Sequence, residues 1–293
     1  MTAQQFDRSR EDTSNIVHLE HVNVTVPDQR LATLFYISGL GLTRDPYLMA
    51  SVDNMWVNVG RSQFHLPTGR PQVLRGRTGL VIPDRAWLLK RLDLVRDGLK
   101  ESRFEVIEQA ACIDAVCPWG NRLRIHEPDQ RFGRVALGMA YLAFDVPAGT
   151  AAGISRFYRD IFAAPARVTA EGGRPCAEVV VGRDQRLLFV EADGALPAYD
   201  GHHIQVYLAD FSGAYRRLRE RGLVSQESSQ WQYRFLDITD LDTGKVLFTI
   251  EHEVRSMTHP LYGRPLVNRN PYQTNNAFAA GYESRSWELP YPG

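Results

Sequence analysis

A fourfold repeat of a strand, a break and a helix constrains the fold of this 293-residue chain more than any other feature. In the first copy, HVNVTVPDQRLATLFYISGLGL, two-residue alternation changes after Asp28 to helical spacing, and the helix ends on glycines. Similar changes follow Asp84, Ala148 and Asp210, at separations of 56, 64 and 62 residues. An aspartate at such a change favours a helix start because its carboxylate accepts backbone N–H groups. The chain is therefore expected to contain four equivalent units.

Each predicted helix is followed by residues with strand character that end in an alternating run, so each unit is expected to be β-α-β-β-β. A lone unit of this kind leaves one face of its sheet uncovered and must pair with another unit. We expect consecutive units to pair, which predicts a first domain over 16–130 and a second over 138–255. A disordered N-terminus over 1–15 and an extended C-terminal arm over 256–293 complete this organisation.

Composition limits the classes of protein that the chain can belong to. Acidic and basic residues balance at 34 each, so no overall field attracts nucleic acid or an anionic membrane. Three irregularly spaced cysteines suit neither a disulfide framework nor a zinc site. The polar N-terminus lacks a signal peptide's apolar segment, and no apolar run has the length of a membrane span. We expect a cytoplasmic protein whose partner is a small molecule, with a homodimer left open.

Four motifs resemble those of the vicinal oxygen chelate superfamily, and the resemblance extends over residues 16–255. They are HVNVTVPD (21–28), HHIQVYLAD (202–210), CPWGNRLRIHEP (117–128) and DLDTGKVLFTIEHE (240–253). The superfamily includes glyoxalase I, bleomycin-resistance proteins and extradiol dioxygenases. The resemblance implies an α+β fold in which paired units form two half-open barrels. It also implies a divalent metal on the concave face, held by the first and last strands of the paired units.

The ligand positions of the superfamily can be carried onto this sequence residue by residue. In the first domain they fall on His21, His65, Arg77 and Arg124, and in the second on Tyr141, a residue near Leu188 or Phe189, His203 and Phe248. The resemblance thus implies His21 and His65 as metal ligands in one domain and His203 in the other, with iron, manganese, zinc or nickel as the ion. Thr243 looks like an insertion, and a bulge there would turn Glu251 or Glu253 inward.

Strand alternation places Arg124 on the inner face of its strand and gives Glu20 the wrong parity to join His21. Two hypotheses follow for the first domain. Either His21 and His65 hold a metal, or arginine binds a carboxylate or phosphate while a neutral histidine moves a proton. The expected catalytic residues are His21, His65 and Arg124. The expected substrate-binding residues are Arg77, Asn23, Gln63, Tyr141 and Tyr207.

The resemblance implies a metal-assisted lyase, isomerase or oxygenase that acts on a small, oxygen-chelating metabolite, with an anionic metabolite among the candidates. The alternative is a metal-free protein that binds or sequesters a small molecule, as in the bleomycin-resistance branch. The proline-rich and aromatic C-terminal arm is expected to pack across the barrels or onto a second subunit. It would act there as a structural wrap or as a lid through Tyr262, Arg264 and Arg269.

Overall fold

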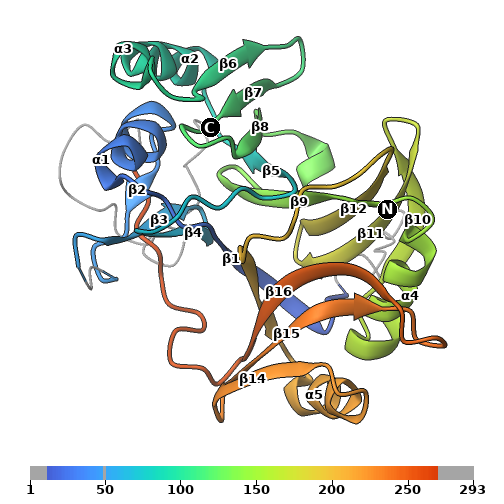
Figure 1. The fold of residues 1–293 in the computed structure, drawn as a ribbon. Helices are drawn as coiled ribbons and strands as arrows, with labels where there is room; N and C mark the ends of the chain where they lie inside the picture. The colour runs from blue at the N-terminus through green and yellow to red at the C-terminus, as the bar shows by residue number, and fades with distance from the viewer. Residues whose placement is uncertain (1–11, 49–50, 270–293) are drawn as a thin grey trace, which may run out of the picture.

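The computed structural model describes residues 12–48 and 51–269, and within them the chain forms the four predicted units (Figure 1). Unit one contains β1 (Ile16–Asn23), α1 (Gln29–Ala32), the π-helix η2 (Thr33–Gly39), β2 (Thr43–Arg44), β3 (Asn54–Val59) and β4 (Ser62–Pro67). Unit two contains β5 (Gly76–Val81), α2 (Arg85–Leu94), α3 (Arg96–Leu99), β6 (Glu105–Glu108), β7 (Ile113–Val116) and β8 (Arg122–His126).

A short 3-10 helix, η3 (Gln130–Phe132), lies between the two halves of the chain. Unit three contains β9 (Gly138–Pro147), α4 (Ala151–Phe162), β10 (Ala166–Glu171), β11 (Arg174–Gly182) and β12 (Gln185–Ala192). Unit four contains β13 (His203–Leu208), α5 (Phe211–Glu220), β14 (Val224–Ser229), β15 (Gln232–Thr239) and β16 (Val246–Ser256).

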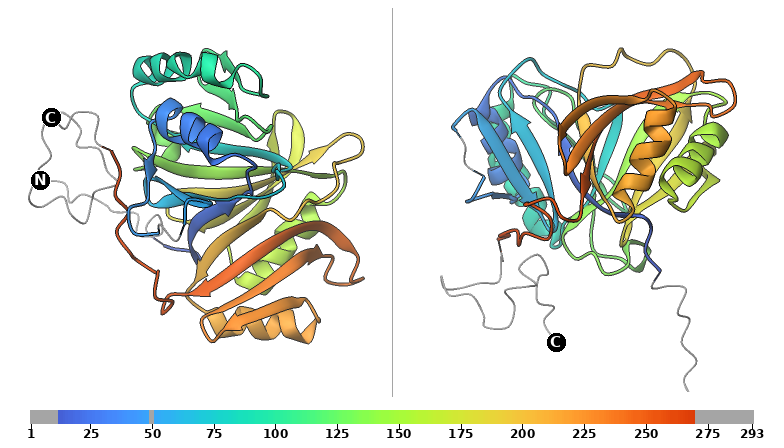
Figure 2. Two further views of the ribbon diagram at one scale, coloured as in Figure 1. Left: turned by 60° about the vertical axis from the view of Figure 1, so that its left-hand side comes forward. Right: turned by 90° about the horizontal axis from the view of Figure 1, so that it is seen from below.

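The strands form two open, mixed sheets of eight strands, each made by two units. Sheet 1 has the order β14-β15-β16-β13-β1-β4-β3-β2, and sheet 2 has the order β10-β11-β12-β9-β5-β8-β7-β6. Within each sheet the first strands of the two units lie side by side at the centre and run antiparallel. Figure 2 shows the two sheets next to each other, with helices on the outside of the molecule.

Sheet 1 joins units one and four, and sheet 2 joins units two and three. The expected division into 16–130 and 138–255 is therefore wrong for the sheets, because consecutive units do not share one. The repeat identifies each unit, but in all four units the first strand lies at the edge where another unit can pair. Local pattern therefore cannot distinguish which first strand pairs with which, and this choice depends on long-range packing.

Consecutive units are nevertheless joined through their helices. Helix α4 packs on β10 to β12 of its own unit and also contacts β15 and β16 of unit four. There Phe157 and Phe162 lie 6.0 and 5.4 Å from Phe235, measured between ring centroids. In the other half, η2 packs against α2, and the Arg91 guanidinium donates to the Ile37 carbonyl at 3.1 Å. One continuous hydrophobic core therefore links both sheets.

The predicted helices are confirmed in all four units, and an aspartate caps three of them. The carboxylates of Asp28, Asp84 and Asp210 accept backbone N–H groups of the first turn, whereas Thr150 before α4 makes no such side-chain bond. Such caps stabilise a helix by about 1 kcal/mol each. Among the described residues no helix is both long and apolar enough to cross a membrane.

The chain ends differ in part from the expected disordered N-terminus and extended arm. Residues 1–11 and 270–293 lie outside the described residues. Asn15 is ordered, because its side chain donates to the Phe162 carbonyl at 2.7 Å and accepts from the Asp210 N–H. Residues 12–15 are therefore part of the fold. At the other end, β16 runs as far as Ser256, and residues 257–269 continue across sheet 1 (Figure 1).

Candidate metal centre

Three histidines from neighbouring strands of sheet 1 converge on one point. Strand β1 lies between β4 and β13, and Asn23 of β1 is aligned with both His65 and His203. His21 precedes Asn23 by two residues and faces the same side. One ring nitrogen from each histidine lies within 4.8 Å of the others. His203 therefore belongs to the same site as His21 and His65, and its expected place in a separate domain is wrong.

Glu20 orients the first of these histidines. The His21 Nδ1–H donates to Glu20 Oε2 at 3.2 Å, and both side chains are buried. This bond leaves Nε2 as the unprotonated nitrogen, and Nε2 has no hydrogen-bond partner among the described residues. Strand parity predicts that Glu20 points the other way, but the β1–β13 register shifts between Leu19 and His21. The irregularity places two consecutive side chains on one side.

His65 is held by its neighbours on β3. Its Nε2–H donates to Asn54 Oδ1 at 2.7 Å, which leaves Nδ1 available as a ligand. Its ring stacks on Trp56 with centroids 3.8 Å apart and an interplanar angle of 12°. The edge of His21 lies against the same indole, at 5.0 Å between centroids. Trp56 therefore forms an apolar wall that fixes two of the three imidazoles.

Two carboxylates of β16 adjoin the third histidine. Glu251 Oε1 lies 3.6 Å from His203 Nδ1, and Glu253 Oε2 lies 3.7 Å from Nε2. Glu253 is aligned with Gln205, just as His65 is aligned with Asn23, so Glu253 is the counterpart of His65 in unit four. The hypothesis of an inward-facing glutamate is thus confirmed by the structure.

The ligand position carried onto Phe248 is wrong. Phe248 is buried in the core between Phe144 and Phe189, at 5.8 and 6.0 Å between ring centroids. The β15–β16 register shifts twice along the strand, which displaces the inward positions from those that an uninterrupted alternation predicts.

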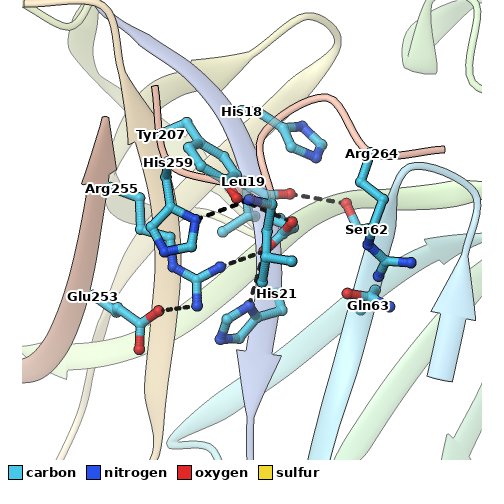
Figure 3. A network of polar contacts seen from close by, with 12 residues as sticks. His18, Leu19, His21, Ser62, Gln63, Tyr207, Glu253, Arg255, His259 and Arg264 are labelled. Atoms are coloured by element: carbon cyan, nitrogen blue, oxygen red, sulfur yellow. Dashed lines mark hydrogen bonds and ion pairs between the residues drawn. The ribbon is translucent and has the colours of Figure 1, made fainter. Parts of the chain in front are cut away.

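Arginines compensate the acidic side chains around the cluster. Arg234 pairs with both Glu251 and Glu253. Arg255 pairs with Glu253 at 2.5 Å (Figure 3) and with Glu20 at 3.2 Å. Burial raises the pKa of Glu253, and the two arginines oppose this effect. The buried acids are therefore held in fixed positions by charge-assisted bonds.

Burial keeps all three imidazoles neutral at physiological pH. It lowers the pKa of His65 to about 3, with the positive charges of Arg255 and Arg234 adding to the effect. It also lowers the pKa of His21 and His203 well below the ordinary value, and nearby cationic groups contribute in the same direction. A neutral imidazole is the form that binds a metal ion.

Three of the expected substrate-binding residues lie close to this cluster. Asn23 is buried on β1 between His65 and His203 in the strand alignment. Gln63 is buried and donates to Asp45 at 3.0 Å and to Asn58 at 2.6 Å. The Tyr207 hydroxyl donates to Glu20 Oε1 at 3.3 Å, so it supports the carboxylate that orients His21.

The structure places the other three predicted site residues in sheet 2. Arg124 forms a bidentate pair with Asp114 at 2.7 and 2.8 Å, and Arg77 pairs with Glu171 at 2.8 Å. The Tyr141 hydroxyl lies 3.1 Å from His126 Nε2. The expectation that Arg124 shares a face with His21 and His65 is therefore wrong, because it followed from pairing units one and two.

The described part of the C-terminal arm crosses one end of the histidine-bearing face (Figure 3). The Tyr262 ring packs on Tyr207 at 4.9 Å between centroids. Arg264 forms a two-bonded ion pair with the fully buried Asp45, at 2.9 and 3.3 Å. The Arg269 N–H donates to the Thr43 hydroxyl. The described part of the arm thus packs across sheet 1 of the same chain. This is one of the two expected arrangements.

Sequence reasoning missed five residues of the site, and one of them is Arg234 of β15. Glu20 and Arg255 lie in segments that the repeat identifies, but their positions depend on strand irregularities and on the pairing of units one and four. Trp56 and Asn54 lie on β3 beside His65. Alternation along NMWVNV (54–59) puts these two on the same face, and this signal could have identified them.

Comparison with known structures gives the same architecture. Maize glyoxalase I superposes with a TM-score of 0.57 at 10% identity, covering 82% of this chain and 92% of the maize chain. A candidate dioxygenase from Bacillus subtilis superposes with a TM-score of 0.54 at 13% identity, covering 85% and 87%. No protein-family model matches the sequence, and a search of curated proteins finds no relative. The chain thus has the fold of the vicinal oxygen chelate superfamily.

Proposed function

We propose that the chain is a metal-dependent enzyme whose centre is formed by His21, His65 and His203. The observation that carries the proposal is the convergence of their ring nitrogens within 4.8 Å, with the buried Nε2 atoms of His21 and His203 making no hydrogen bond among the described residues. Buried polar atoms are nearly always satisfied, so unpaired nitrogens that face one another fit a bound cation.

The donor set suits iron, manganese, zinc or nickel. Imidazole is a good ligand for several of these ions, and a nearby carboxylate completes a mixed nitrogen and oxygen set. Glu253 is the best candidate for that fourth ligand because it is the counterpart of His65 and lies 3.7 Å from His203 Nε2. When bound, such an ion supplies Lewis acidity toward the oxygen atoms of a substrate.

The protein's own groups define what can react there. Glu20 keeps the Nδ1–H tautomer of His21, and Asn54 keeps the Nε2–H tautomer of His65. Trp56 packs against two of the imidazoles and Tyr262 of the arm packs on Tyr207, while Asn23 offers an amide to a substrate oxygen. We infer a lyase, isomerase or oxygenase acting on a small molecule with two adjacent oxygens, in a cytoplasmic protein.

Elemental analysis of the untagged protein tests the proposal. We expect near-stoichiometric iron, manganese, zinc or nickel in the wild type and its loss in a His21→Ala, His65→Ala variant. Retention of the metal in that variant would place it elsewhere. A wild type that stays metal-free after incubation with each of the four ions would favour the alternative, a protein that only binds a small molecule.

A further inference from the structure

One buried glutamine beside the histidine cluster has an amide without a partner. Gln205 of β13 is fully buried, and neither its Nε2 nor its Oε1 makes a hydrogen bond among the described residues. An unsatisfied amide in the protein interior costs free energy, and the great majority of buried polar atoms are paired. An amide of this kind is suited to a hydrogen-bonding partner that the chain itself does not supply.

Strand pairing places Gln205 at the histidine cluster. Ile204 packs in the core, whereas His203 and Gln205 on either side of it face away from the core. Gln205 is aligned with His21 of β1 on one side and with Glu253 of β16 on the other. Directly opposed residues of an antiparallel pair, such as Gln205 and His21, have Cβ atoms about 4.5–5.5 Å apart. The amide therefore lies next to side chains that we assign to the metal centre.

A second glutamine in an equivalent place is already engaged. Gln63 of β4 is aligned with His21 on the side opposite to Gln205, and it is also buried. Its Nε2 donates to Asp45 at 3.0 Å and to Asn58 at 2.6 Å. Two buried glutamines thus flank His21, and the protein holds the amide of one but not of the other. Gln205 is the one whose amide is available to a ligand of the centre.

The charged side chains of this face do not use the amide of Gln205. Arg234 and Arg255 each pair with two glutamates around the cluster, and neither of them bonds to Gln205. Within the described part of the chain, no group therefore competes with a ligand for this amide.

We propose that Gln205 orients the oxygen atoms of a substrate at this centre, an inference that rests on the metal centre proposed above. Its Nε2 can donate to a coordinating oxygen, and its Oε1 can accept from a hydroxyl group of the same ligand. A coordinating oxygen keeps a lone pair that can accept from Nε2, whereas an aromatic nitrogen uses its lone pair on the ion. Gln205 thus makes the centre favour oxygen ligands over nitrogen ligands.

Calorimetric titration of protein loaded with zinc, or with another of the four ions, tests this role. The probe 1-hydroxypyridin-2-one coordinates through two adjacent oxygens, whereas 1-methylimidazole coordinates through one nitrogen and then has no hydrogen-bonding atom left. Gln205→Leu should bind the pyridinone at least about tenfold more weakly than wild type, and 1-methylimidazole within about twofold of wild type. Gln226→Leu, which changes an exposed glutamine on β14, is the matched control and should bind both probes as the wild type does.

Metal affinity and stability show whether the amide acts on the ligand or on the protein. Chelator competition should give the same metal affinity for Gln205→Leu and wild type. The urea midpoint of Gln205→Leu should not fall, because no hydrogen bond within the described chain is lost. Gln63→Leu should unfold at a lower urea concentration, because it loses its bonds to Asp45 and Asn58.

The outcomes separate this inference from the metal centre itself. A wild type that binds none of the four ions would overturn the centre and this inference with it. In metal-loaded protein, four results for Gln205→Leu would each overturn the role of Gln205 and leave the centre in place. They are an unchanged affinity for the pyridinone, an equal weakening of both probes, a lower metal affinity and a lower urea midpoint.

Discussion

The two sheets have the same topology, but their inner faces carry different chemistry. Sheet 1 collects neutral histidines whose ring nitrogens face one another, whereas sheet 2 collects arginines that are each paired with an acid, Arg124 with Asp114 and Arg77 with Glu171. In sheet 1 unpaired nitrogens are left in a buried space. In sheet 2 the charges neutralise one another. One scaffold therefore supports a candidate metal centre in one sheet and an ion-pair network in the other.

Replacing one histidine in each sheet tests this comparison with the largest expected effect. We expect His203→Ala to weaken metal binding by more than about 100-fold, since loss of an outer-shell partner alone typically costs 10- to 100-fold in affinity. His126→Ala, in sheet 2, should leave the affinity unchanged. Competition with a chromogenic chelator measures both constants. Equal weakening in the two variants would contradict the assignment of the centre to sheet 1.

A smaller effect is expected from the carboxylate that orients His21. Glu20→Gln keeps the size of the side chain but removes the charge that favours the Nδ1–H tautomer, so metal affinity should fall by roughly 10- to 100-fold. Glu171→Gln removes a carboxylate from the ion pair with Arg77 in sheet 2 and serves as the control. The same chelator competition applies. An unchanged affinity in Glu20→Gln would mean that His21 needs no such support.

The histidine of sheet 2, His126, should make the free energy of unfolding depend on pH. Burial lowers the pKa of His126 to about 4, while the unfolded chain titrates near 6.5. Because the unfolded state binds the proton first, the stabilisation is complete above pH 6.5 and is lost as pH falls toward 4. Urea denaturation from pH 7 to 4 should therefore show a shallower loss of stability in His126→Gln than in wild type. Parallel pH profiles would show that His126 is not buried in this way.

The smallest effect should come from the ion pair of sheet 2. Asp114→Asn removes the charge that holds Arg124, and both side chains are partly exposed. We expect a loss of about 1 kcal/mol in the free energy of unfolding, as for a well-aligned but solvated pair. Urea denaturation at neutral pH measures it, and metal content should not change. A loss of metal in Asp114→Asn would link the two sheets in a way that the geometry does not indicate.

Local sequence pattern was sufficient to predict the four units and three of their helix caps, because period and capping depend on neighbouring residues. The superfamily resemblance identified His21, His65 and His203. It did not show that they meet, because the pairing of units one and four is a long-range choice. Glu20 and Glu253 were harder to place, since a strand irregularity in β1 and register shifts beside β16 override simple alternation.

X-ray absorption spectroscopy of the metal-loaded protein tests the central claim most directly. The account predicts one ion per chain with scattering from at least three imidazole rings, at about 2.0–2.1 Å if the ion is zinc. His203→Ala should lower the imidazole contribution. A spectrum with oxygen ligands only, or one unchanged by that substitution, would contradict a metal centre in sheet 1.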